Sequence, residues 1–234
     1  MGANEPSGVE PRKQIEGASD QLGLSLGESN VDKLLAYRDL LLRWNRVYNL
    51  TALRDPAEVL SRHLIDCLAV LPALRRHAND RPLRVLDVGS GGGLPGVVLA
   101  MLQPDWQVTC VDTVAKKAAF VRQAAGELRL PKLISVHSRV EALVPSAAGS
   151  GLSPALGPFE LITSRAFASL ADFATLTQHL LAPGGVWAAM KGKPGDDELA
   201  SVPAEVDVFH VEPIQVPGLD AQRCLVWMRP RSSN

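Results

Sequence analysis

After Pro82 the chain alternates between short runs rich in β-branched residues and longer amphipathic stretches, and no other feature constrains its fold as much. The runs that read as strands are residues 84–88, 106–111, 133–136, 159–163 and 186–190. The stretches that read as helices are residues 94–102, 114–128 and 168–181. This alternation predicts an open, doubly wound parallel sheet with right-handed crossovers and helices on both faces.

The end of the chain departs from this alternation. Two strand patterns, residues 206–211 and 223–228, follow one another without a helix between them, so we expect an antiparallel hairpin that closes the sheet. The Gly-, Pro- and Ser-rich residues 145–158 are expected to form a loop between strands. The predicted class is therefore α/β, with a Rossmann-like sheet of parallel strands and an antiparallel C-terminal hairpin.

The part of the chain before the sheet is predicted to be helical. One amphipathic pattern begins at Ser29, and a second helix begins near Pro56 with Asp55 as its N-cap. Residues near the N-terminus are rich in Gly, Pro, Ser and charge, a composition typical of a flexible tail. The expected organisation is a flexible tail over residues 1–28, a small helical cap over 29–80 and an α/β domain over 82–230.

Composition excludes several other classes of protein. Hydrophobic residues make up 46% and charged residues 21%, which is typical of a globular chain. The 24 basic and 25 acidic residues give a net charge of −1, which excludes a chain-wide basic coat but allows a local basic patch. The three cysteines lack a C-x-x-C pair, so we expect no disulfide framework and no metal site. Free cysteines suit a reducing compartment, so we expect the protein in the cytoplasm. No apolar run is long enough to span a membrane, and no membrane partner is expected.

A glycine-rich loop, Asp87–Gly96 (DVGSGGGLPG), follows the first predicted strand. Glycine is needed where a strand turns sharply into a helix and a ligand lies against bare backbone. Two patterns fit these residues. The G-x-G-x-x-G spacing from Gly91 matches the dinucleotide fingerprint. The acid-x-G-x-G-x-G spacing from Asp87 matches the loop of methyltransferases that use S-adenosylmethionine (SAM).

The context of the loop favours a SAM site. Asp112 ends the next strand, where either cofactor would have its ribose hydroxyls bound, so it does not discriminate. The predicted C-terminal hairpin does discriminate between the two cofactors, because SAM-dependent methyltransferases of this fold end with such a hairpin. An NAD(P)-dependent oxidoreductase remains the main alternative, although the chain has no recognisable hydride-transfer acid or Tyr-x-x-x-Lys pair. The near-neutral charge argues against a third class, a non-catalytic RNA-binding module.

Several segments together point to a known family. They are Arg43–Arg54 (RWNRVYNLTALR), Arg62–Asp66 (RHLID), Asp87–Gly96, Ser138–Glu141 (SRVE), Ser164–Leu170 (SRAFASL) and Val216–Asp220 (VPGLD). With these segments the chain resembles the RsmG (GidB) family of bacterial 16S rRNA guanine-N-7 methyltransferases over roughly residues 30–230. The resemblance implies SAM as the cofactor and a guanine N-7 in the decoding region as the acceptor. The expected partner is 16S rRNA or a small-subunit ribosomal particle, and no DNA partner is expected.

The resemblance also implies how a cofactor site would be divided. The residues expected to contact the cofactor are Gly89, Gly91, Gly93, Leu94, Asp112, Val140, Glu141 and Arg165. The backbone of Val140 and Glu141 would face the adenine, and Asp112 would hold the ribose by analogy with the fold. Arg165, at the open rim, is expected to position the reactants and not to act as a general base.

The end of the fourth predicted strand indicates which chemistry the site lacks. Its residues, Ser164–Phe167, contain neither the Asn/Asp-Pro-Pro-aromatic loop of amine methyltransferases nor a nucleophilic cysteine. Guanine N-7 carries a lone pair and no proton, so its methylation needs no general base. A site without a base is therefore compatible with this acceptor, although another RNA position also remains open.

Basic residues near the expected mouth of the site are candidate RNA contacts. They are Arg46, Arg54, Arg62, His63, Arg165, Lys191 and Lys193, of which we single out Arg62, His63 and Lys191. For His63 a structural role is equally compatible with the sequence. Phe167, Trp44 or Tyr48 could stack on a base, although core packing is the favoured interpretation for Trp44 and Tyr48.

Overall fold

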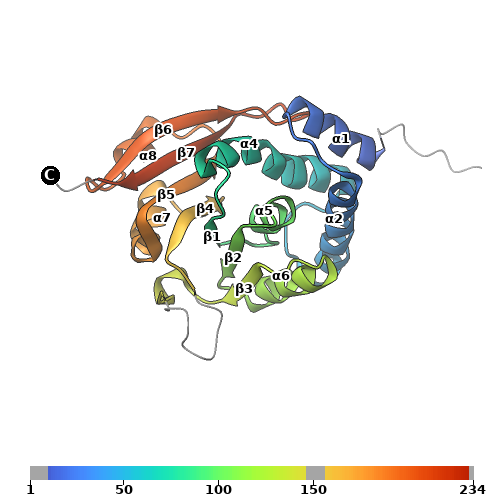
Figure 1. The fold of residues 1–234 in the computed structure, drawn as a ribbon, viewed down its shortest axis with the longest axis horizontal. Coiled ribbons are helices and arrows are strands. Elements are labelled where there is room, and N and C mark those ends of the chain that lie inside the picture. Colours follow the sequence, from blue (N-terminus) through green and yellow to red (C-terminus); the bar gives the residue numbers. More distant parts are fainter. Residues whose placement is uncertain (1–9, 146–155, 232–234) are drawn as a thin grey trace, which may run out of the picture.

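The computed structural model describes residues 10–145 and 156–231, which form a seven-stranded sheet covered by helices (Figure 1). The strands are β1 (Arg84–Val88), β2 (Gln107–Asp112), β3 (Leu133–His137), β4 (Phe159–Arg165), β5 (Leu181–Lys191), β6 (Val206–Ile214) and β7 (Arg223–Pro230). Their order in the sheet is β3-β2-β1-β4-β5-β7-β6. The predicted fold class is confirmed, because β1 to β5 pair in parallel and β7 pairs antiparallel with both β5 and β6.

The strand order reverses direction between β1 and β4. From β1 the chain proceeds outward to β2 and β3, and then returns to place β4 on the other side of β1. In open α/β sheets, ligands bind at the carboxyl ends of the strands beside such a switch point. The fold alone therefore places a candidate site beyond Val88 and Arg165, where these two neighbouring strands end.

Helices cover both faces of the sheet. The helical segments are α1 (Pro11–Gln21), α2 (Glu28–Tyr48), α3 (Pro56–Val59), η1 (Leu60–Ile65), α4 (Asp66–Ala78), α5 (Gly96–Leu102), α6 (Ala115–Glu127), η2 (Val140–Ala142), α7 (Leu170–Thr177), η3 (Gln178–Leu180) and α8 (Asp196–Ala200). Alternate strand residues point to opposite faces. Val85 therefore joins the core under α2, α4, α5 and α6, whereas Leu86 joins the core under α7.

The predicted N-cap of the second helical segment is confirmed. The side chain of Asp55 accepts hydrogen bonds from the backbone N–H groups of Ala57 and Glu58. The helical region then continues through η1 and α4 as far as Ala78.

The prediction of a flexible tail is wrong for residues 11–21, which form α1. Its apolar side chains are few, but Ile15 and Ala18 are buried on one face, and Leu24 follows them into the same core. Burial of this short stripe stabilises a helix whose average composition is polar. Residues 1–9 of the predicted tail, and residues 146–155 of the predicted loop, lie outside the described residues.

Two predicted boundaries also differ from the structure. The helix expected over residues 168–181 ends as η3 at Leu180, and β5 begins at Leu181, before the Pro-Gly-Gly turn expected to precede it. The pairing of β4 with β5 shifts register between Phe159 and Leu161, which accommodates these residues within the strand.

Candidate active site

The loop after β1 needs glycine for two separate reasons. Gly89, Gly91 and Gly93 have positive φ angles of 64°, 58° and 85°, which side chains rarely adopt. A Cβ at Gly93 would lie 2.3 Å from Cγ2 of Val97, so this glycine is required for packing against α5. At Gly91, by contrast, the nearest atom to an added Cβ is a backbone oxygen at 4.0 Å. The loop thus presents open backbone at Gly91.

Asp112, at the end of β2, holds this loop in place. Its Oδ2 accepts a hydrogen bond from the N–H of Gly91 at 2.9 Å, and its Oδ1 accepts one from the N–H of Val114 at 2.8 Å. The ammonium of Lys117 lies 3.9 Å from Oδ2. Since each carboxylate oxygen has two lone pairs, Asp112 can still accept further hydrogen bonds at the sheet edge.

Asp87 lies inside the protein behind the loop. Its Oδ2 accepts a hydrogen bond from the N–H of Gly96 at 2.8 Å, while its Oδ1 has no partner among the residues described. A Cβ at Gly96 would lie 2.3 Å from Sγ of Cys110 and 2.8 Å from Asp87 Oδ2, so only glycine fits there. Burial is the main cause that raises the pKa of Asp87 to about 7.

Tyr37 of α2 supports the same loop from the helical cap, although it is not among the site residues predicted from the sequence. Its ring is fully buried, and its hydroxyl donates a hydrogen bond to the carbonyl of Gly92. The signal was present, because Leu34, Tyr37 and Leu41 share one helical face at three- and four-residue spacing. The cap therefore contacts the glycine loop directly.

Arg165, at the end of β4, is the centre of a polar cluster on the other side of the loop. Its Nη1 donates to the carbonyl of Arg62 at 3.1 Å and lies 3.4 Å from Oδ2 of Asp66. The other oxygen of Asp66 accepts a hydrogen bond from Nε of Arg223 at 2.9 Å. One buried carboxylate thus bridges two guanidinium groups, which leaves this trio with a net positive charge.

His63 completes the cluster. It lies in η1, a π-helical segment, a distortion found often at functional sites. Its Nδ1 is 3.2 Å from Nη1 of Arg165 and its Nε2 is 2.7 Å from Oγ1 of Thr51. The same Nδ1 also lies 3.1 Å from the carbonyl oxygen of Arg62, so it can accept from Arg165 in one tautomer of the ring or donate to Arg62 in the other. Burial, followed by the charge of Arg165, lowers the pKa of His63 to about 4, so the ring is neutral near pH 7.

The other two singled-out RNA candidates have protein partners. The ammonium of Lys191 donates to the carbonyl of Ala168 at 3.0 Å and to Oε1 of Glu198 at 2.7 Å. The exposed guanidinium of Arg62 lies 3.6 Å from the carboxylate of Glu58, while its carbonyl faces Arg165. An exposed ion pair is worth little, so the contact with Glu58 holds the side chain of Arg62 only weakly, and an RNA contact there stays a prediction.

These groups surround a cavity of about 480 Å³ at the carboxyl edge of the sheet, which we call the loop cavity. Its lining residues from the predicted sets are Gly89, Gly91, Leu94, Arg165, Arg62, His63 and Lys191, and Thr51, Asp66 and Arg223 join them. The predicted cofactor residues outside this lining are Gly93, Asp112, Val140 and Glu141, and the candidate RNA contacts outside it are Arg46, Arg54 and Lys193. Val140 and Glu141 lie in η2, just beyond β3, so an adenine contact there stays a prediction.

The three aromatic residues that could stack on a base differ in their surroundings. A Cβ at Gly89 would lie 2.8 Å from Cδ2 of Phe167, so the Phe167 ring lies against the glycine loop. Ala166, whose φ is +55°, turns the chain between Arg165 and this ring. Trp44 packs on Phe120 with ring centroids 5.5 Å apart, whereas Tyr48 is 42% exposed, unlike a core side chain.

Comparisons with known proteins give one consistent result. Residues 30–226 match the family described as "GidB: rRNA small subunit methyltransferase G". A protein from Leptothrix cholodnii named "Ribosomal RNA small subunit methyltransferase G" is 57% identical, and the match covers 94% of this chain and 96% of that one. Its namesake from Bordetella avium is 48% identical, with 96% of each chain covered.

Solved structures share the fold at low sequence identity. The SAM-bound magnesium protoporphyrin IX methyltransferase of Synechocystis PCC 6803 superimposes with a TM-score of 0.57 at 13% identity, covering 97% of this chain and 100% of that one. A SAM-dependent methyltransferase from Aquifex aeolicus gives 0.53 at 16% identity, with 77% and 96% covered. These similarities concern the architecture of the sheet and its helices.

Proposed function

The chain belongs to the rRNA small subunit methyltransferase G family, and from this premise we propose that it transfers a methyl group from SAM to N-7 of a guanine in 16S rRNA. The observation that carries the proposal is the family match over residues 30–226, joined to an open glycine loop at the switch point of the sheet. A nucleotide-sized cavity beside that loop provides room for the reacting groups.

The residues at the loop fit SAM. Gly91 leaves room for a ligand against the backbone, whereas the Phe167 ring already lies against Gly89, and the unpartnered Oδ1 of Asp87 is a buried acceptor behind the loop. Gly89, Gly91 and Leu94 would hold the cofactor at the loop, with Asp112, Val140 and Glu141 further along the sheet edge. SAM, when bound, supplies an electrophilic methyl group on a positively charged sulfur.

The polar groups of the loop cavity suit an acceptor without a proton. Asp66 is held by two arginines, and Nδ1 of His63 lies against both Arg165 and the carbonyl of Arg62. Neither is a free general base. The rate would then come from alignment of N-7 with the methyl group, an effect that can contribute several kcal/mol. Arg165, fixed by these contacts, would orient the cofactor or a substrate phosphate at the rim.

We further propose that the substrate is presented in the cytoplasm, as 16S rRNA or as a small-subunit particle. The three cysteines are buried free thiols, which suits a reducing compartment. Among the described residues, no helix is long and apolar enough to cross a membrane.

The identity of the cofactor can be tested by thermal unfolding. SAM and S-adenosylhomocysteine should each raise the melting temperature of the protein, because a ligand that binds only the folded state stabilises it. The variant Gly89→Val should abolish this shift, since its side chain would collide with the Phe167 ring and strain a φ of +64°, and so would displace the loop. The control variant Gly126→Val, where an added Cβ meets nothing within 4 Å, should retain it. A shift produced by NADH and not by SAM would instead support the oxidoreductase.

The identity of the acceptor atom can be tested by chemical cleavage of the product RNA. Methylation at N-7 leaves a positive charge on the guanine ring and weakens the glycosidic bond. After incubation with labelled SAM and rRNA, borohydride reduction and aniline should therefore cut the RNA at one site. Labelled RNA that resists this cleavage, or yields a ribose-methylated nucleoside, would contradict N-7 while leaving methyl transfer intact.

A further inference from the structure

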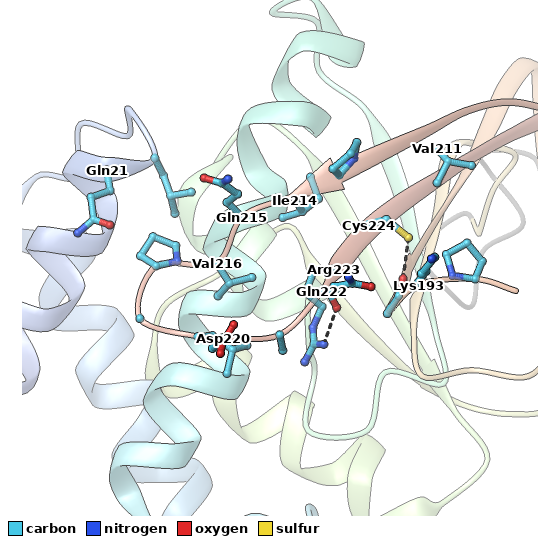
Figure 2. A pocket seen from close by; sticks show the side chains of 18 residues that line it. Gln21, Lys193, Val211, Ile214, Gln215, Val216, Asp220, Gln222, Arg223 and Cys224 are labelled. Carbon is cyan, nitrogen blue, oxygen red and sulfur yellow. Dashed lines mark hydrogen bonds between the residues drawn. The ribbon is translucent and has the colours of Figure 1, made fainter.

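A second and larger cavity has a volume of about 950 Å³ (Figure 2). It is formed by the loop that joins β6 to β7, by residues 192–194 after β5, and by Gln21 and Leu22 at the end of α1. We call it the hairpin cavity. The two cavities share Gly192 and Arg223 in their linings, so a ligand longer than one nucleotide could extend from one into the other.

The ridge between the cavities is held by hydrogen bonds. The thiol of Cys224 donates to the carbonyl of Gly192 at 2.8 Å, and the guanidinium of Arg223 donates to Asp66 and to the carbonyl of Gln222. Lys191, just before Gly192, is fixed by Glu198. A ridge fixed in this way provides a defined position for a ligand that crosses it.

The walls of the hairpin cavity offer the groups that a nucleotide needs. Figure 2 shows Gln215, Val216 and Asp220 along the β6–β7 loop, with Gln21 toward one end and Lys193 toward the other. Within the part of the chain that the structure describes, the ammonium of Lys193 makes no hydrogen bond or ion pair. The side-chain amides of Gln21 and Gln215 likewise have no hydrogen-bond partner there. Val216 is buried and gives the wall an apolar surface.

We propose that the hairpin cavity binds the nucleotide adjacent to the target guanosine in the RNA strand. Arg223, on the shared ridge, contacts the phosphate between the two nucleotides, and Lys193 contacts the next phosphate. The assignment rests on the proposed function, because the loop cavity must receive the guanine. The two lining residues shared with that cavity, Gly192 and Arg223, together with the cations Arg223 and Lys193, favour an RNA strand over a docked protein.

The first test measures RNA affinity as a function of salt. The variant Lys193→Gln should bind a single-stranded rRNA fragment about fivefold more weakly, and the slope of log K against log salt should decrease in magnitude by about 0.7. Affinity for S-adenosylhomocysteine should not change. The matched control is Lys132→Gln, an exposed lysine at the opposite edge of the sheet that pairs with Asp105. Equal affinities and slopes in the two variants would overturn the assignment.

The second test uses short ligands that compete with the rRNA fragment. Guanosine monophosphate should compete weakly, and a dinucleotide carrying one more nucleotide on its 5′ or 3′ side should compete at least fivefold better. Lys193→Gln should lose this gain, whereas Lys132→Gln should keep it. If neither dinucleotide competed better than guanosine monophosphate, the assignment would be overturned. It would also be overturned if the Lys193→Gln variant methylated naked rRNA normally but ribosomal particles poorly. The latter result would indicate a protein partner.

The results distinguish failure of the proposed function from failure of the second nucleotide site. A wild-type protein that transfers no methyl group to rRNA would overturn both. A protein that methylates rRNA, but whose Lys193→Gln and Lys132→Gln variants behave alike, would overturn only the second nucleotide site.

Discussion

Replacement of Asp87 by asparagine is expected to stabilise the ligand-free protein at pH 8 by about 4 kcal/mol, and to change its stability little at pH 4. Burial raises the pKa of this carboxyl in the folded protein to about 7, from an ordinary value of 3.8. The folded state therefore binds a proton that the unfolded state releases between these two pH values. Stability is full below about pH 4 and is lost as the pH rises through about 7. A difference of about three pKa units corresponds to about 4 kcal/mol.

The measurement is urea unfolding of wild type and Asp87→Asn at a series of pH values. The asparagine keeps an oxygen that can accept the hydrogen bond from Gly96, but it has no charge to bury. The difference between the two proteins should grow from pH 4 to pH 7 and then level off. Asp197→Asn, which removes an exposed carboxyl in α8, is the control for general effects of charge. Parallel stability curves for wild type and Asp87→Asn would show that Asp87 ionises without penalty.

The sheet could be predicted because its signals are local. Each strand carries β-branched residues over a few positions, and the glycine loop lies between β1 and α5 within ten residues of sequence. Asp112 could be predicted as a site residue for a similar reason. It ends β2, the strand paired with β1, and so must lie at the carboxyl edge of the sheet beside the loop. Features whose geometry depends on one or two neighbouring elements can therefore be predicted from a single sequence.

Helix α1 shows where composition misleads. Polar and charged residues dominate residues 10–28, so an averaged composition predicts a tail. Only a few apolar side chains, led by Ile15, decide the outcome, because their burial depends on a core built by residues much later in the chain. Gln21 and Leu22, at the end of this helix, line the hairpin cavity, which no local pattern could indicate.

The cluster around Asp66 could not be assembled from the sequence. Its ion pairs join residues separated by 99 and 157 positions, so their geometry depends on how β4, β7 and the helical cap pack together. The π-helical turn at His63 has no recognisable sequence signal, yet it places a carbonyl and a ring nitrogen against Arg165. The sequence indicated Arg165 as a site residue but gave no indication of what holds it.

Those contacts predict the result of changing Arg165 itself. Arg165→Ala should lower methyl transfer at saturating SAM at least 100-fold, an effect of about 3 kcal/mol, typical for loss of a buried charged hydrogen-bonding group in an active site. The fold should survive, because Asp66 keeps its hydrogen bond from Arg223. Circular dichroism and the thermal shift with S-adenosylhomocysteine report on folding and on cofactor binding separately from turnover.

The conservative variant distinguishes geometry from charge. Arg165→Lys should recover little activity, because the lysine ammonium is one bond nearer the backbone than Nη1, the atom that contacts Arg62, His63 and Asp66, and lysine lacks the other nitrogens of the guanidinium. Arg122→Ala, which removes an exposed arginine from α6, is the control and should retain wild-type turnover. If charge alone mattered, lysine would restore most of the rate. If Arg165→Ala turned over RNA at the wild-type rate, the residue would have a structural role, and the positive charge at the rim would have to act through Arg223.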